Sequence, residues 1–207
     1  MTQVREVAQG WLLKSFLRDS IEATGLFLDE CLNVCSVVEI AAKGKAASHE
    51  LHHVFNALPL KNHKLPFPEK LSRLERVFGI CSPLAPHVLS INRARNCVVH
   101  RLGLVSLLDT DPQNELVVNW ITTKAVAREI ETGRELVLDR PGLLIERESL
   151  LDVHWVEHQK KYRLGEQIKL TRFELNSCAV TFYLFGKTCV EAIEEFVGSH
   201  GIALDSN

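Results

Sequence analysis

The chain has 207 residues, a hydrophobic content of 46% and a formal net charge of −2 at pH 7. This length and composition suffice for a single domain with a sizeable core. The near-neutral charge excludes a basic surface over the whole molecule, so nucleic acid would have to be bound through a local patch.

The cysteines and the N-terminal sequence indicate a reducing compartment. None of the six cysteines forms a C-x2-C pair, and most fall within apolar helical patterns. This is typical of buried thiols and not of a disulfide framework or a zinc site. The first residues, MTQVREVAQG, lack the apolar core of a signal peptide, and no apolar run has the length of a membrane span. We therefore expect a soluble, cytoplasmic protein with no membrane contact.

The first half of the chain has helical periodicity. Residues 2–43 form a long helical pattern, and shorter helices are predicted at about 48–58 and at 67–78. A fourth helix, at about 84–102, begins at a proline and is expected to end at a glycine, Gly103. These elements make up a helical core.

The pattern changes after this core. Residues 115–123 are predicted to form a strand, and Thr132-Gly133 forms a turn between two further extended segments. The β-rich insertion covers about 110–170. A last helix at about 171–200 begins with a capping box and returns to the core. The predicted fold is therefore mainly α, a helical bundle in one domain (1–207) with a β-rich insertion before the final helix.

A short run near the end of the fourth predicted helix carries groups that could grip a phosphate and move a proton. The sequence Arg95-Asn96-Cys97-Val98-Val99-His100 brings a guanidinium, an amide and an imidazole together. Arg95 lies in the sector of an apolar stripe formed by Ile91, Ala94, Val98 and Leu102. A charge buried there needs a carboxylate, carbonyls or a phosphate. Arg95 and His100 are about 140° apart around the helix, so either a long arginine side chain or a second chain must join them.

This run resembles the R-x4-6-H motif of HEPN (higher eukaryotes and prokaryotes nucleotide-binding) domains, in which a polar residue often follows the arginine, as Asn96 does here. A helical bundle with the motif late in its core is also similar to that family. The resemblance implies a metal-independent endoribonuclease that needs no cofactor. Arg95 would hold the phosphate, Asn96 would orient it or the histidine, and His100 would act as general acid or base.

The resemblance also implies partners. RNA is the expected substrate, with Arg93 and Arg101 as further contacts to it. In the family the cleft commonly forms where two motif helices meet, so we predict a homodimer with the site at its interface. A toxin-like ribonuclease also implies a cognate antitoxin that restrains it. The alternative is a non-catalytic module of the same kind that binds RNA, nucleotides or a protein.

A competing motif occurs earlier in the chain. The run His49-Glu50-Leu51-His52-His53 fits the H-E-x-x-H pattern in which two histidines bind zinc and the glutamate activates water. On a helix, however, His49 and His53 lie opposite the apolar stripe that contains Leu51. We interpret the run as an exposed histidine-rich face and predict no metal site. A zinc peptidase is the remote alternative.

Overall fold

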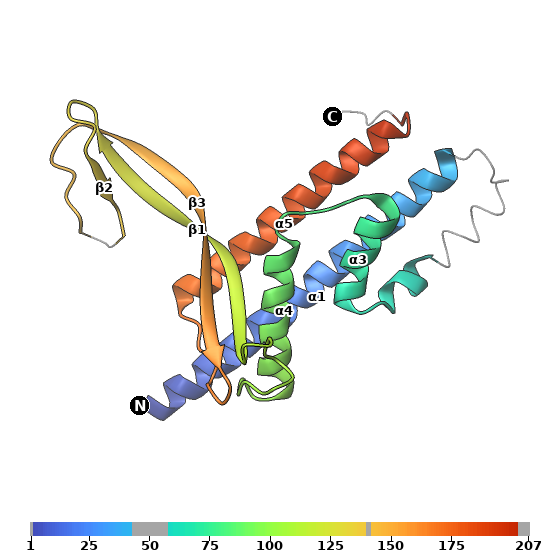
Figure 1. Cartoon of the computed structure of the whole chain (residues 1–207), viewed down its shortest axis with the longest axis horizontal. Coiled ribbons are helices and arrows are strands. Elements are labelled where there is room, and N and C mark those ends of the chain that lie inside the picture. Colours follow the sequence, from blue (N-terminus) through green and yellow to red (C-terminus); the bar gives the residue numbers. More distant parts are fainter. Residues whose placement is uncertain (1, 43–57, 140–141, 203–207) are drawn as a thin grey trace.

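The computed structural model describes residues 2–42, 58–139 and 142–202 (Figure 1). The chain is rich in helix and carries one three-stranded antiparallel sheet ahead of its last helix. This confirms the predicted order of a helical part, a β-rich part and a final helix. The elements are α1 (Thr2–Ala42), α3 (Phe67–Phe78), α4 (Ala85–His100), β1 (Glu115–Glu129), β2 (Glu135–Val137), β3 (Ser149–Arg163) and α5 (Arg172–Ser199).

Helix α1 spans the molecule and packs beside α3, α4 and α5 (Figure 1). Helix α1 continues through Gly25 without a break. The Gly25 carbonyl oxygen accepts a hydrogen bond from Lys70 Nζ at 3.2 Å, which ties α3 to the middle of α1. Helix α5 begins with the predicted capping box, because Thr171 and Glu174 each bond the other's backbone N–H through their side chains.

Two buried clusters hold these elements together. The first joins the N-terminal half of α1 to α4 and to the base of the sheet, and includes Leu17, Ile91, Val98, Leu116 and Trp120. The second joins the C-terminal half of α1 to α3, the start of α4 and α5, and includes Leu28, Leu32, Leu74, Val88 and Phe185. Helix α4 contributes to both clusters, so its last turns are fixed against α1 and β1.

The sheet has the strand order β2-β1-β3. Strands β1 and β3 pair along their full length, from Glu115 opposite Arg163 to Glu129 opposite Ser149. The sequence predicted a strand only to residue 123, but pairing with β3 extends it to Glu129. The predicted turn at Thr132-Gly133 is confirmed, with Gly133 at φ 69° between β1 and β2.

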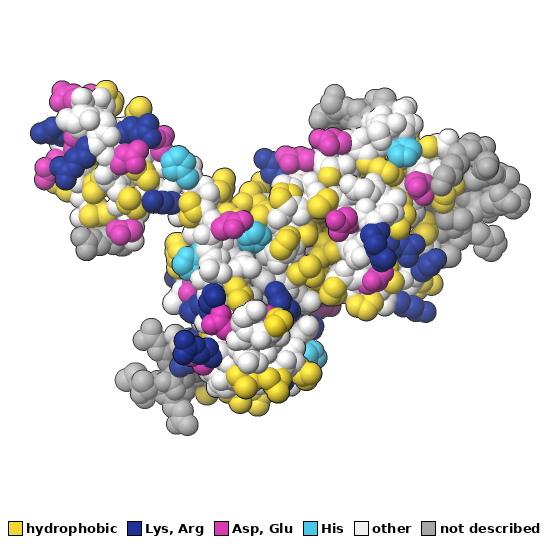
Figure 2. Space-filling model, in the orientation of Figure 1, with side chains coloured by type: hydrophobic (Ala, Val, Ile, Leu, Met, Phe, Trp, Pro, Cys, Tyr) yellow, Lys and Arg dark blue, Asp and Glu magenta, His cyan; other side chains and the backbone are white. Residues whose placement is uncertain are grey.

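The two halves of this hairpin have different surroundings. At the base, alternate residues of β1 enter the first cluster, as period-two alternation requires. The distal half projects away from the helices (Figure 1), and its far end displays many charged side chains (Figure 2). No helix in the described ranges combines the length and the apolar character that crossing a bilayer requires.

Candidate functional site

The predicted motif lies in the last turns of α4, where the chain leaves the helical core. The helix ends at His100, earlier than the expected stop at Gly103. Both Leu102 and Gly103 have left-handed backbones, with φ of 55° and 78°. The left-handed turn that ends the helix therefore begins at Leu102, one residue before Gly103. Leu102 was predicted to face the core, yet its side chain is 81% exposed because it lies in this turn.

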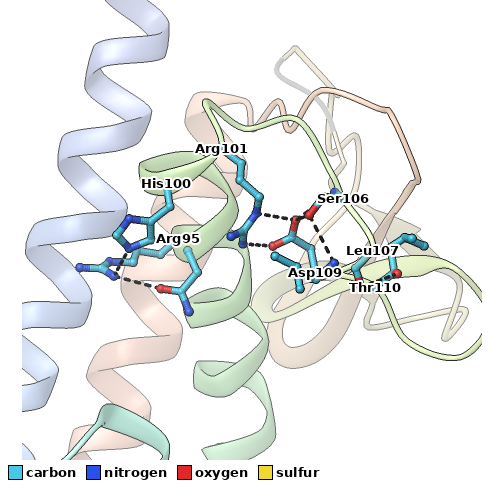
Figure 3. A network of polar contacts seen from close by, with 9 residues as sticks. Arg95, His100, Arg101, Ser106, Leu107, Asp109 and Thr110 are labelled. Carbon is cyan, nitrogen blue, oxygen red and sulfur yellow. Dashed lines mark hydrogen bonds and ion pairs between the residues drawn. The ribbon is translucent and has the colours of Figure 1, made fainter.

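The Arg95 side chain reaches across the end of the helix (Figure 3). Its Nη1 donates a hydrogen bond to Asn96 Oδ1 at 3.0 Å and lies 3.5 Å from His100 Nε2. A long side chain thus spans the roughly 140° between the two positions. One chain is therefore enough to bring the three predicted catalytic groups into contact, with His100 exposed and the other two half-buried.

The Arg95 guanidinium has no carboxylate partner among the described residues. Its Nε is fully buried and donates a hydrogen bond to no acceptor among the described residues. Leaving a buried donor unsatisfied costs about 1–3 kcal/mol. An anion that reached the outer nitrogens of this guanidinium would meet no competing carboxylate among the described residues, which makes it a favourable place for a phosphate.

Arg101 points to the opposite side, toward the loop after α4 (Figure 3). Its Nε donates to Asp109 Oδ2 at 2.9 Å, its Nη2 contacts the other oxygen, and Ser106 donates to Oδ2 through its backbone N–H and hydroxyl. Burial raises the pKa of Asp109, but these hydrogen bonds lower it by a larger amount. The pKa of Asp109 therefore lies below its ordinary value. The predicted RNA contact of Arg101 would thus have to compete with an ion pair, whereas Arg93 is exposed.

Sequence reasoning missed Asp109. Its signal is the Ser106-x-x-Asp109 spacing, which is typical of a carboxylate that accepts hydrogen bonds from a nearby turn. The spacing alone could not identify Arg101 as its cation, because the ion pair depends on how the loop folds back onto the end of α4.

A cleft of about 400 Å³ opens on the other side of Arg95, between α1, α4 and the segment around α3. Asn92, Arg95 and Asn96 line it from α4, and Phe67 lines it from α3. Lys70 also borders the cleft, but its Nζ forms a 2.7 Å ion pair with the buried Asp29. No sequence pattern indicated the cleft, since its walls come from distant segments.

No metal site accompanies these residues in the described ranges, where no cluster of three or more histidine, cysteine, aspartate or glutamate side chains is arranged around a common point. The H-E-x-x-H run at 49–53 lies outside the described residues. All six cysteines are free thiols and only Cys81 is exposed, as the sequence predicted for a set of mostly buried thiols. Burial raises the pKa of Cys31, Cys35 and Cys178 to about 12.

The arrangement combines a cation that has no counter-charge in the described ranges, an amide and an exposed imidazole at the open end of one helix. These groups are suited to bind a phosphate and to transfer a proton beside it. No protein-family model, no curated protein and no solved structure matches the chain. The function is therefore inferred from the chemistry of the site.

Proposed function

We propose that the protein is a metal-independent endoribonuclease that uses Arg95, Asn96 and His100, in the manner implied by the likeness of this run to the HEPN motif. The observation that carries the proposal is the position of Arg95, whose Nη1 lies 3.5 Å from His100 Nε2 while its charge has no described carboxylate partner. A phosphate bound there would lie within reach of the imidazole.

The reaction is an internal transfer at phosphorus. The 2′-hydroxyl oxygen attacks the adjacent phosphate, the bond from phosphorus to O5′ breaks, and the products carry a 2′,3′-cyclic phosphate and a 5′-hydroxyl. His100 accepts the proton of the 2′-hydroxyl or donates one to O5′, and water exchanges the other proton. Arg95 offsets the charge that builds on the phosphate oxygens, and Asn96 holds the guanidinium in place through its Oδ1.

The proposal includes a homodimer around the end of α4. The contact of Arg95 with His100 within one chain removes the geometric need for a second chain. An exposed apolar surface supports a dimer instead, since Trp11, Leu102, Leu107 and Leu108 are 66%, 81%, 68% and 85% exposed. A ribonuclease must be restrained in the cell that makes it, so the proposal also implies an antitoxin as a partner.

The test is cleavage of labelled single-stranded and structured RNAs in the presence of EDTA. We expect the wild type to cut and to leave cyclic phosphate ends, and Arg95→Ala and His100→Ala to lose at least a hundredfold in rate. His154→Ala, which removes an exposed histidine of the distal hairpin, is the matched control and should keep full activity.

The same assay separates the alternatives. Binding of RNA without cleavage by folded wild type would contradict the ribonuclease and favour a non-catalytic binding module. Activity against peptides that disappears with chelator would instead point to His49 and His53 as zinc ligands.

A further inference from the structure

The cleft beside Arg95 is lined by an asparagine that has no hydrogen-bond partner among the described residues. Asn92 is 7% exposed, lines the cleft, and forms no hydrogen bond with any described residue. Three residues along the same helix, Arg95 Nε is also buried and unpartnered among those residues. Buried polar groups in proteins are nearly always hydrogen-bonded. Asn92 is an exception that lines the cleft, and a ligand bound there would supply the missing partner of its amide.

Phe67 brings an aromatic ring to the cleft. The Phe67 ring stands across Gly25, where a β-carbon would lie 3.9 Å from the ring, and prolines at 66 and 68 flank it. An aromatic wall facing an amide suits a planar heterocycle, because unpaired RNA bases are bound by stacking on aromatic rings and by hydrogen bonds to their edges. The volume of about 400 Å³ is within the range of small-molecule sites.

The charges around the cleft disfavour an occupant with several phosphates. Lys70 is held by Asp29 at 2.7 Å, and His63 Nδ1 lies 3.2 Å from the same carboxylate. The exposed acid Glu22 stands at the rim. Arg95 is then the one lining cation in the described part of the chain whose charge has no counter-ion. A neutral base attached to a single phosphate matches this distribution.

We propose that the cleft is a subsite for an unpaired adenine next to the scissile phosphate, which deepens and depends on the proposed ribonuclease. An asparagine amide presents a donor and an acceptor side by side, and this pair matches the N6 and N7 atoms of adenine. Arg95 links the two halves of the site, because its Nη1 faces His100 and the residue also lines the cleft. The selection of the base and the cleavage of the phosphate bond would therefore both depend on the side chain of Arg95.

Binding of adenosine monophosphate, cytidine monophosphate and inorganic phosphate to the full chain tests the subsite by calorimetry. The wild type should prefer the adenine nucleotide, and Asn92→Leu should weaken that binding about tenfold to a hundredfold while leaving phosphate binding unchanged. Asn176→Leu, at an exposed position of α5, is the matched control and should change neither. The thermal midpoint of Asn92→Leu should not fall, because the amide it removes has no described partner.

Nuclear magnetic resonance of the wild type gives a readout that does not depend on a variant. Adenosine monophosphate should shift the side-chain amide of Asn92 and the ring of Phe67. Equal binding of both nucleotides with no effect of Asn92→Leu would overturn the subsite. Cleavage that depends on Arg95 and His100 but shows no preference for adenine would also overturn it while the ribonuclease stands. Adenine-selective binding through Asn92 without any cleavage would instead contradict the proposed ribonuclease activity and support the adenine subsite.

Discussion

Arg95 and Arg101 are six residues apart and have opposite surroundings. Arg101 is neutralised by Asp109, which is 3% exposed and also accepts hydrogen bonds from Ser106. Arg95 contacts only an amide and an imidazole among the described residues. Because a paired charge stabilises the fold and an unpaired one is available to a ligand, the two arginines are expected to differ in role.

Substitution by methionine separates these roles. Arg95→Met deprives no described carboxylate of its cation, so the free energy of unfolding should change by less than about 1 kcal/mol. Arg101→Met leaves the buried Asp109 without its cation and should lower that free energy by about 3 kcal/mol. Urea unfolding followed by circular dichroism measures both values. An equal loss in the two variants would mean that Arg95 is a structural cation and not a phosphate ligand.

The pKa of Asp109 predicts how stability depends on pH. Its folded pKa lies below the ordinary value, because the hydrogen bonds from Arg101 and Ser106 outweigh the effect of burial. Such a carboxyl contributes stability above its unfolded pKa of about 3.9, and this contribution is lost as pH falls through the lower folded pKa. The stability advantage of wild type over Asp109→Asn should therefore shrink as pH falls from about 4.5 to 3. Asp139→Asn, an exposed control, should follow the wild type at every pH.

At the scale of elements, the β1–β3 hairpin consists of an anchored base and a projecting arm. Helix α5 fixes the base, because Thr181 Oγ1 accepts from the Ile121 N–H at 2.8 Å and Ser177 Oγ donates to Thr122 Oγ1 at 3.1 Å. Between Thr122 and Val156, no strand residue belongs to the two core clusters. In β3 the cluster residue is Tyr162, which pairs with Leu116 at the base. The arm is thus expected to add little to the stability of the helices.

Deletion of the arm tests this division. Thr122 pairs with Val156, so residues 123–155 can be replaced by Asn-Gly, which closes a two-residue hairpin at that pair. The shortened chain should keep the helical circular dichroism of the full chain, and its thermal midpoint should fall by less than about 5 °C. Loss of cooperative unfolding would show that the arm belongs to the same folding unit as the helices.

At the scale of the whole molecule, the proposed dimer predicts the molecular mass of the protein in solution. Hydrophobic side chains gather at the lower end of the molecule in Figure 2, where the loop after α4 lies. Burial of Leu102 and Leu108 between two copies would remove a large apolar surface from water. We therefore expect light scattering to give twice the 23.3 kDa of one chain. The double variant Leu102→Glu, Leu108→Glu should give one chain.

Leu144→Glu is the control for this prediction, because Leu144 is 75% exposed but lies outside the loop after α4. It should leave the mass unchanged. A wild type that remains monomeric at micromolar concentration would contradict the dimer. It would leave the ribonuclease intact, since Arg95 and His100 meet within one chain.

The sequence by itself determined features that depend on neighbours along the chain. Helical spacing located α3 and α4, the Thr171–Glu174 capping box located the start of α5, and Thr132-Gly133 located a turn. The spacing of Arg95 and His100 left either a long side chain or a second chain to join them, and the contact lies within one chain. These features follow from local geometry, because each is fixed within a few residues.

Only the tertiary structure decided what surrounds those residues. The ion pair of Arg101 with Asp109 needs a loop that folds back, and the cleft at Asn92 needs α1 and Phe67 from distant parts of the chain. The length of β1 likewise depends on pairing with β3. Periodicity specifies which face of an element is buried but not against what it packs. The partners of a charge, and therefore its availability to a ligand, depend on that packing.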